Sequence, residues 1–385
     1  MHGFSAHAPA LAGHSFKQIL ALDLGKFNSV LCLYDPRTAV HSFADVQTTP
    51  QALHDLLAAH ASAEEDPSQL LVVMETCDVC GWVYDLAIAL GLGVVVANPS
   101  SEAWKWKKVK RKTDRDDALK LARLTALSQL PTVHMPPANV RQRRRLIRHR
   151  KALVERRTIS KNQIRSIHSQ QGLLLPRDKS VWSKAGIAQL RQLCRPIIQC
   201  DEMNLWRGRL AVELDLLEAL DAQIQQVDAK LDELGAADAK VQLLQSVPGV
   251  GPRLAETVVA CLDDVTRFKS ASQLGSYAGL VPKQMESGTM KRIGRITRAG
   301  SSLLRGMLVE VAWMVYRHNT WARSFVQRVS RGMKTRKRIA IVALARKLLV
   351  KLWAMLRDGT AWRDPCVERE DARMKCVDLA ALGRV

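Results

Sequence analysis

Three aspartates open a predicted helix directly after a run of basic residues. Asp114, Asp116 and Asp117 follow the stretch from Lys105 to Lys112. A first-turn aspartate ordinarily caps a helix, because its carboxylate accepts hydrogen bonds from free backbone N–H groups. Asp114 and Asp117 stand three residues apart and share one helix face, so they could instead hold one hard cation between them. Asp116 points elsewhere, which favours the plain capping role for that residue.

Two further acids lie in apolar, strand-like segments upstream. Asp23 lies in the segment 18–25, which a turn joins to a second apolar segment over 29–34, and this pair predicts a hairpin. Glu75 lies near the end of the segment 70–76. A carboxylate within a buried strand is costly unless a cation or several donors compensate it. Asp23 is therefore either a metal ligand or a solvated residue at a strand end.

The elements around these acids predict an α/β layer domain. Helices are expected over 50–60 and 82–90, and a short strand over 93–98. Acids at the carboxyl ends of central strands lie where open α/β sheets place their chemistry.

The four acids Asp23, Glu75, Asp114 and Asp117 are accordingly expected to converge on a pair of Mg²⁺ ions, with Mn²⁺ able to substitute. Oxygen donors without His or Cys suit a hard cation. Two such ions would stabilise both the attacking and the leaving oxygen of a phosphodiester displacement.

Composition favours a polyanionic partner. The chain of 385 residues is long enough for two or three domains, and 58 Lys and Arg against 37 Asp and Glu give a formal charge of +21. This balance indicates nucleic acid before membrane. The first sixteen residues lack the pattern of a signal peptide, and no apolar run reaches membrane-spanning length, so we expect a soluble, cytoplasmic protein without a membrane partner.

Eight scattered cysteines predict reduced thiols. Cys77 and Cys80 form the one Cys-x-x-Cys pair in the sequence. No second close Cys or His pair follows them, so buried thiols are expected rather than a zinc site.

A basic helix is expected to bind nucleic acid. The helical stretch 141–168 holds eleven cations and the single acid Glu155. So many positive side chains close together repel one another unless phosphates neutralise them. The alternative is that they form an ordinary solvent-exposed helix face. The candidate nucleic-acid contacts of the whole chain are Lys108, Lys110, Arg111, Lys112, Arg143, Arg144, Arg145, Arg148, Gly249, Gly251, Lys291, Arg292, Arg295 and Arg298.

A heptad pattern follows. The seam repeats every seven residues at Leu210, Leu217, Ile224 and Leu231, and Gly235 is expected to stop the helix. Two interpretations stay open, an intramolecular pairing with the basic helix and a coiled-coil dimer seam.

The last block contains the pattern of a helix-hairpin-helix element. Gly249 and Gly251 allow a tight turn and Pro252 suits the first position of a helix, whose free N–H groups can bind phosphate. Helices are also expected over 301–317 and 339–356. Ser287, before a glycine, is by spacing alone an ordinary loop residue.

These motifs together resemble the insertion sequence 110/1111 family of DEDD transposases. The resemblance rests on Leu20-Ala21-Leu22-Asp23 with Lys26, Val73-Met74-Glu75-Thr76, Asn98-Pro99, Lys112-Thr113-Asp114-Arg115-Asp116-Asp117-Ala118 and Glu286-Ser287-Gly288. Cys77-Asp78-Val79-Cys80 departs from the small and aromatic residues expected after Glu75. The resemblance implies an RNase H-like (RuvC-like) nuclease domain that uses the four acids. It also implies that Ser287 is a catalytic nucleophile forming a phosphoserine intermediate.

Further implications concern partners. The resemblance implies a bacterial, nucleoid-associated enzyme that binds DNA at the element ends and target, together with a structured guide RNA encoded by the element. It implies a homo-oligomer, a dimer or tetramer, whose composite site takes acids from one protomer and the serine domain from another. In the resembled family a coiled-coil region lies between the two catalytic parts, which favours the dimer seam.

The expected organisation is an α/β nuclease domain, an α-helical, coiled-coil region and a mostly α-helical domain. The boundaries are 1–16 for a disordered tail, 17–131 for the RuvC-like domain, 132–240 for the basic helix and coiled coil, 241–358 for the helix-hairpin-helix domain with Ser287, and 359–385 for a C-terminal tail. The predicted function is a DNA transposase or recombinase. The alternatives are a metal-only nuclease or Holliday-junction resolvase, in which Ser287 is structural, and a non-enzymatic nucleic-acid-binding protein.

Overall fold

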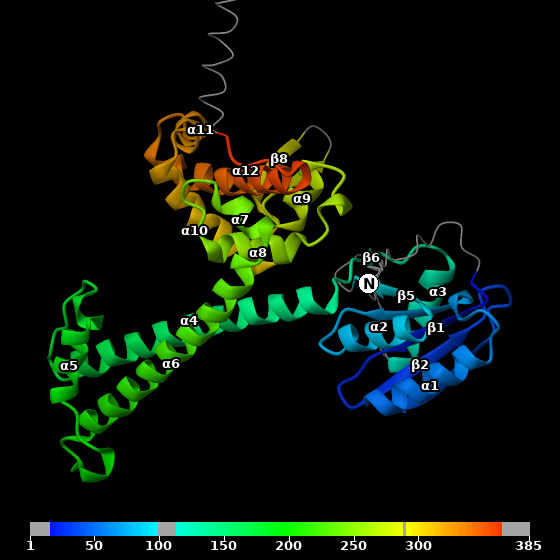
Figure 1. Cartoon of the computed structure of the whole chain (residues 1–385), viewed down its shortest axis with the longest axis horizontal. Coiled ribbons are helices and arrows are strands. Elements are labelled where there is room, and N and C mark those ends of the chain that lie inside the picture. Colours follow the sequence, from blue (N-terminus) through cyan, green and yellow to red (C-terminus); the bar gives the residue numbers. More distant parts are fainter. Residues whose placement is uncertain (1–15, 99–112, 288–289, 364–385) are drawn as a thin grey trace, which may run out of the picture. The chain divides into compact units, whose positions relative to one another are not determined.

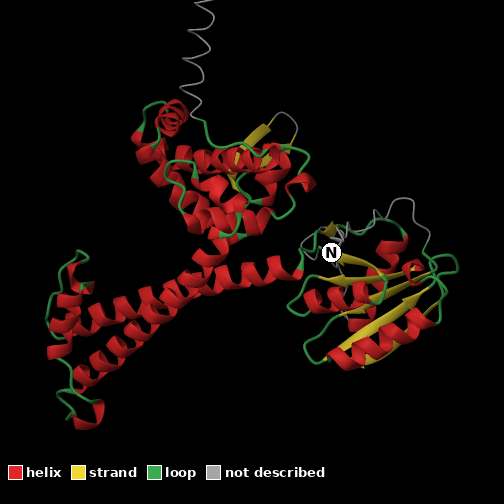
Figure 2. Ribbon diagram, viewed as in Figure 1, coloured by secondary structure: helices red, strands yellow, loops and turns green. Residues whose placement is uncertain are grey.

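The computed structural model describes residues 16–98, 113–287 and 290–363. The chain divides into two compact units, residues 1–138 and 139–385. Figure 2 shows their different make-up: the first combines strands with helices, and the second is mostly helical. Within the described ranges, no helix is both long enough and apolar enough to cross a bilayer.

The described part of the first unit contains a six-stranded sheet in the order β3-β2-β1-β4-β5-β6. Strand β1 runs antiparallel to β2 and parallel to β4, which in turn runs parallel to β5. The strands are β1 (Gln18–Asp23), β2 (Asn28–Tyr34), β3 (His41–Gln47), β4 (Leu70–Glu75), β5 (Gly93–Ala97) and β6 (Thr132–Val133).

Helices cover both faces of this sheet. Helices α1 (Pro50–Ser62) and α2 (Cys80–Ala89) pack on the face that carries Leu20 and Leu22, whereas α3 (Asp114–Ala126) packs on the face that carries Ala21. Side chains alternate between faces along a strand, so this division follows directly from the buried apolar runs. The mixed α/β arrangement is consistent with an RNase H-like fold.

The sequence predictions for this unit are confirmed for the hairpin, the two central parallel strands and the three helices. Strands β3 and β6 were not predicted. Strand β3 lies at the sheet edge with mostly exposed side chains, and β6 is two residues long and begins at residue 132, where the basic-helix region was expected to begin.

Two long helices begin the second unit and run side by side (Figure 1). They are α4 (Ala138–Gln170) and α6 (Leu205–Ala236), separated in sequence by α5 (Lys184–Gln192). Arg150 binds Asp228 at 2.5 Å and Arg157 binds Asp221 at 3.1 Å. Aspartates of α6 thus neutralise part of the positive charge of α4 within the same chain.

The heptad seam of α6 is buried inside the single chain. Leu210, Leu217, Ile224 and Leu231 are all at most 5% exposed. They belong to apolar clusters that also contain residues of α4, such as Leu153. The intramolecular interpretation therefore accounts for the heptad pattern.

Helix α6 ends at Ala236, one residue beyond the Gly235 that was expected to stop it. A Cβ at this position would lie 2.8 Å from Glu256 Oε1. The absence of a side chain at Gly235 leaves room for the Glu256 carboxylate of α8.

The remaining helices pack around α12, whose Leu344, Leu348 and Leu352 are fully buried. A two-stranded antiparallel hairpin, which was not predicted, lies between α9 and α10. These elements are α7 (Ala239–Gln245), α8 (Pro252–Leu262), α9 (Ala271–Tyr277), β7 (Pro282–Ser287), β8 (Met290–Ile296), α10 (Ser302–His318), α11 (Thr320–Ser330) and α12 (Lys337–Asp358).

Candidate active site

Asp23 and Glu75 lie next to each other at the carboxyl ends of two central strands of the sheet. They are the last residues of β1 and β4, which are parallel neighbours paired through Leu22 and Met74. Both acids have the strand parity of residues that pack against α3, such as Ala21 and Val73. By the alternation of side chains, both carboxylates project from the α3 face.

The first turn of α3 lies at this same end of the sheet. Arg115 donates to Asp45 on β3 at 3.2 Å. Asp45 pairs with Val30, and Val30 pairs with Asp23, so the three residues form one cross-strand row. The contact from Arg115 therefore places the start of α3 over the row that contains Asp23.

Asp117 lies on the sheet-facing side of α3. It is only 9% exposed, and the same helix face buries Ala118, Leu121 and Ala122. Asp114 lies one turn earlier and is exposed. A buried carboxylate at this position is costly without compensation, which distinguishes Asp117 from an ordinary surface acid.

Asp116 is the capping residue, as its spacing predicted. Its carboxylate accepts from the Thr113 backbone N–H at 3.0 Å and from the Thr113 hydroxyl at 2.7 Å. In return, the Asp116 N–H donates to Thr113 Oγ1 at 3.2 Å. This reciprocal capping box satisfies the helix start, so Asp114 and Asp117 are not needed for it.

The donor chemistry of the acids suits Mg²⁺, since all four offer carboxylate oxygens. Among the residues that the structure describes, no three Asp, Glu, His or Cys side chains form a ready ligand set for a metal ion. The structure thus brings Asp23 and Glu75 to one edge and one face, with the buried Asp117 on the helix above. Their closure around a metal stays a prediction.

Cys77 and Cys80 follow Glu75 in the connection to α2. Cys77 is exposed and Cys80, the first residue of α2, is buried. A hydrogen bond with the Cys80 side chain lowers the pKa of Cys77 to about 6. The expectation that both thiols are buried is therefore wrong for Cys77, which lies in the connection before α2 and is exposed to solvent.

Ser287 lies at the end of β7, where it pairs with Met290 of β8. It belongs to the second unit, whereas the four acids belong to the first. The spacing had indicated an ordinary loop residue, but the structure places Ser287 at the tip of a hairpin strand. The nucleophilic role of its hydroxyl stays a prediction.

The basic residues of α4 divide into two groups. Arg143 is partly buried and binds Asp238 at 2.6 Å, and Arg144 donates to the carbonyl oxygens of Ala260 and Cys261. These contacts use both guanidinium groups to join α4 to the helices beside it, and the contact of Arg143 and Arg144 with nucleic acid stays a prediction. Arg145 and Arg148 are exposed and stay candidates.

The other candidate contacts lie in the turn before α8 and along the hairpin. Gly249 has a φ of 93°, and a Cβ there would approach Val315 to 3.1 Å, while Gly251 is the N-cap of α8. The exposed basic residues of β8 and the following turn are Arg292, Arg295 and Arg298. Lys108, Lys110, Arg111 and Lys112, and the side chains of Ser287 and Lys291, lie outside the described part.

One buried acid was not singled out from the sequence. Glu256 lies in α8, is 1% exposed, and forms an ion pair with Arg253 at 3.2 Å. Burial raises its pKa to about 7, against the opposing effect of Arg253 and Arg143. The signal was the otherwise apolar stretch 254–262, in which Glu256 and Thr257 are the exceptions, so that an acid falls on a helix that is packed on most sides.

Comparisons with known proteins match both units. A family model described as "Transposase IS116/IS110/IS902 family" matches residues 241–327, and a DEDD transposase model of the IS110 type matches residues 20–170. A probable family 20 transposase of Pseudomonas aeruginosa is 30% identical over 305 residues, covering 76% of this chain and 86% of that protein. The transposase for insertion sequence element IS1111A of Coxiella burnetii is 28% identical over 304 residues, covering 76% and 79%. The transposase for insertion sequence element IS1328 of Yersinia enterocolitica is 24% identical over 298 residues, covering 76% and 85%.

Proposed function

This chain belongs to the IS116/IS110/IS902 family of transposases, and we propose that it cuts and rejoins the DNA of an insertion sequence with Mg²⁺ held by Asp23, Glu75, Asp114 and Asp117. Membership of the family makes the protein a DNA transposase. The metal, the nucleophile, the guide RNA and the finer fold assignments are the proposed part.

The observation that carries the metal proposal is the adjacency of Asp23 and Glu75. Neighbouring strands lie about 4.8 Å apart, so carboxylates that leave adjacent strand ends on one face are within reach of a common ion. Two carboxylates so placed repel each other, and a divalent cation bound by both would remove that repulsion. Asp117 adds a third, buried acid from the start of α3. When bound, Mg²⁺ supplies Lewis-acid stabilisation of phosphate oxygens.

Ser287 is proposed as the nucleophile. Its oxygen would bond to phosphorus of the DNA strand while a DNA oxygen leaves with a proton, which gives the phosphoserine intermediate. A serine hydroxyl is a weak nucleophile at neutral pH and needs activation. The exposed cations of β8 and the following turn, Arg292, Arg295 and Arg298, are suited to stabilise the additional negative charge.

The finer fold assignments follow from family membership together with the topology. We propose that the first unit is RuvC-like, which its sheet order and the acids at adjacent strand ends support. We propose that α7, the Gly249 turn and α8 form a helix-hairpin-helix element. A coiled-coil contact between chains would need a surface other than the α6 seam, whose leucines are already buried.

DNA and a structured guide RNA are the proposed partners, acting in a homo-oligomer in the bacterial nucleoid. The formal charge of +21 supports a large polyanionic partner, since neutralised phosphates release counterions on binding. The composite site, with acids from one protomer and Ser287 from another, accounts for the separation of these residues into different units.

A denaturing gel of protein incubated with element-end DNA, Mg²⁺ and co-purified RNA tests this proposal. Wild-type protein should give strand exchange and a covalent protein–DNA adduct. Ser287→Ala should abolish both, and Glu75→Gln should do the same. Metal-dependent cutting that survives in Ser287→Ala would instead identify a metal-only nuclease. Strand exchange that survives in Glu75→Gln would contradict the metal site.

A further inference from the structure

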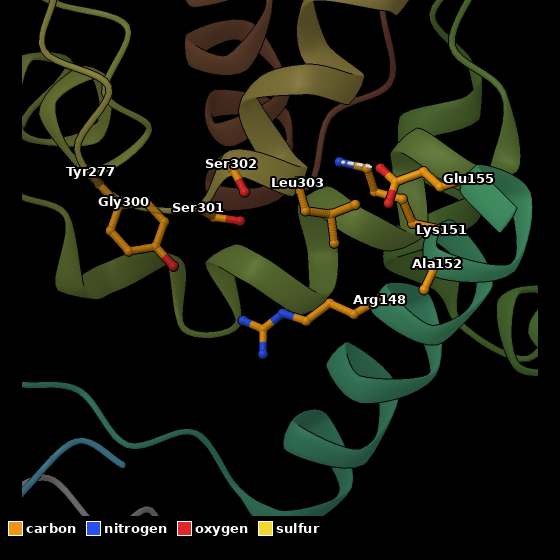
Figure 3. A pocket seen from close by; sticks show the side chains of 9 residues that line it. All are labelled: Arg148, Lys151, Ala152, Glu155, Tyr277, Gly300, Ser301, Ser302 and Leu303. Atoms are coloured by element: carbon orange, nitrogen blue, oxygen red, sulfur yellow. Dashed lines mark ion pairs between the residues drawn. The ribbon is translucent and has the colours of Figure 1, made fainter. Parts of the chain in front are cut away.

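A solvent-open cavity of about 550 Å³ lies between α4 and the start of α10, within the second unit. Its walls come from α4, the end of α9 and the turn before α10 (Figure 3). The lining residues are Arg148, Lys151, Ala152, Glu155, Tyr277, Gly300, Ser301, Ser302 and Leu303. A cavity of this size admits a phosphate group together with its sugar.

Arg148 supplies an uncommitted positive charge to this cavity. Other arginines of α4 form ion pairs with aspartates of α6, as Arg150 does with Asp228 and Arg157 with Asp221. Arg148 makes no hydrogen bond or ion pair with any residue in the described part of the chain. Figure 3 shows its guanidinium group extending toward Tyr277 below Ser301.

Lys151 and Glu155 come from the same helix as Arg148 and form an ion pair of 3.6 Å (Figure 3). Both are at least 44% exposed, so solvent screens their attraction and the pair can yield to a stronger partner. With Arg148, the lining side chains carry two positive charges and one negative charge, which favours an anionic ligand.

The start of α10 adds hydrogen-bond donors that also favour an anionic ligand. Ser301 is the N-cap, and its hydroxyl oxygen accepts from the Leu304 N–H at 3.2 Å. Ser302 and Leu303 are the first two residues of α10, so no carbonyl group of the helix lies four residues before them. Their backbone N–H groups therefore lack partners within the helix. The exposed Ser302 hydroxyl adds a further donor, and the helix dipole favours negative charge here.

The wall opposite Arg148 is held in place before any ligand binds. Tyr277 donates from its hydroxyl to the Cys261 carbonyl oxygen at 2.9 Å, and the Arg267 guanidinium lies 4.7 Å from its ring centroid. Gly300 has a φ of 72°, and a side chain there would collide with the Tyr277 carbonyl oxygen. A preformed wall lowers the entropic cost of binding.

We propose that this cavity binds a phosphate group of a nucleic-acid strand, with Arg148 and Lys151 as the charged contacts and the start of α10 as the donor of uncharged hydrogen bonds. The proposal deepens the proposed function and rests on it, because it assigns the polyanion recognised by that transposase to a specific site. Neither the metal ions nor Ser287 takes part in this contact.

Binding of a labelled mixed-sequence DNA oligonucleotide to the full chain, measured in EDTA over a salt series, tests the assignment. Arg148→Ala should weaken binding about tenfold or more and lower the salt slope by about 1, as expected for one lost phosphate contact. Arg156→Ala is the matched control, because Arg156 is an exposed arginine of the same helix outside the cavity. It should change binding less than about twofold.

Ser302→Asp separates a binding defect from a folding defect. An aspartate at the first position of α10 stabilises the helix start, so the melting temperature should not fall. The same carboxylate repels phosphate, and DNA affinity should fall about tenfold or more.

Two outcomes would overturn the assignment. Equal effects of Arg148→Ala and Arg156→Ala would show that Arg148 acts only as general surface charge. DNA affinity that is unchanged in Ser302→Asp would overturn it as well. If inorganic phosphate also raised the melting temperature of the wild type but not of this variant, the cavity would be a site for a free anion and not for DNA. Failure of the wild type itself to bind DNA would overturn the proposed function together with this site.

Discussion

Glu75 stands directly beside Asp23, one residue beyond the register pair Leu22–Met74, with both carboxylates on the α3 face of the sheet. Neither residue is a neighbour of the other in sequence. The parallel pairing of β1 with β4 creates the juxtaposition, and the buried Asp117 comes to the same end through α3.

The first prediction concerns this pair of acids. Mg²⁺ should raise the melting temperature of the wild type, and Glu75→Gln should abolish that increase, because removing one ligand lowers affinity for the folded state. Binding at a concentration of 100 times Kd would stabilise the fold by about 2.7 kcal/mol. Differential scanning calorimetry with and without Mg²⁺ measures the effect. An equal increase in the variant would place the stabilising metal elsewhere.

The second prediction separates two aspartates that are neighbours in sequence. Asp116→Ala should lower the free energy of unfolding by about 1 kcal/mol through loss of the capping box, and should leave strand exchange intact. Asp117→Asn should abolish strand exchange with little loss of stability. Urea unfolding and the exchange assay give both quantities. The reverse assignment of effects would show that Asp116 is the ligand.

Much of the candidate site could be predicted from the sequence, because strand ends and the spacing of residues on a helix are local patterns. Asp23, Glu75 and Asp117 follow from apolar runs and from three-residue spacing. Local patterns did not reveal which arginines of α4 pack against the protein's own chain, as Arg143 and Arg144 do, because a run of one charge does not indicate its packed face.

The heptad seam shows the same limit. Leucines such as Leu217 predict a packed stripe on α6, but the pattern does not say whether the partner helix belongs to the same chain. Strand β7 also escaped prediction, since the sequence around Ser287 lacks a clear alternation of apolar and polar residues.

The third prediction tests that seam. Leu217→Ala should lower the free energy of unfolding by about 2–5 kcal/mol at every protein concentration, because the lost contacts lie within one chain. Leu216→Ala is the matched control, since Leu216 is 48% exposed, and should change stability by less than about 0.5 kcal/mol. Melting temperatures that rise with protein concentration in the wild type and not in Leu217→Ala would identify the seam as a contact between chains.

The fourth prediction follows from the buried acid of α8. Burial raises the pKa of Glu256 from 4.5 to about 7, with Arg253 and Arg143 opposing the effect and Asp232 and Asp228 adding to it. The folded state therefore binds this proton more tightly than the unfolded chain. Its contribution to stability is complete below pH 4.5 and is lost as the pH rises to about 7, by on the order of 3 kcal/mol.

Glu256→Gln should flatten this part of the pH–stability curve, because the amide stays neutral. Urea unfolding of both proteins between pH 4.5 and 8 provides the comparison. Parallel curves for the wild type and the variant would mean that Glu256 titrates at its ordinary value.

The most direct test of the metal site is cleavage of the polypeptide by Fe²⁺ bound in place of Mg²⁺, with ascorbate and peroxide generating hydroxyl radicals at the ion. The wild type should be cut near residues 23, 75 and 114–117, Mg²⁺ should suppress all three cuts together, and Glu75→Gln should lose them. Cuts confined to one of these segments, or cuts that neither Mg²⁺ nor the substitution affects, would contradict a shared metal site.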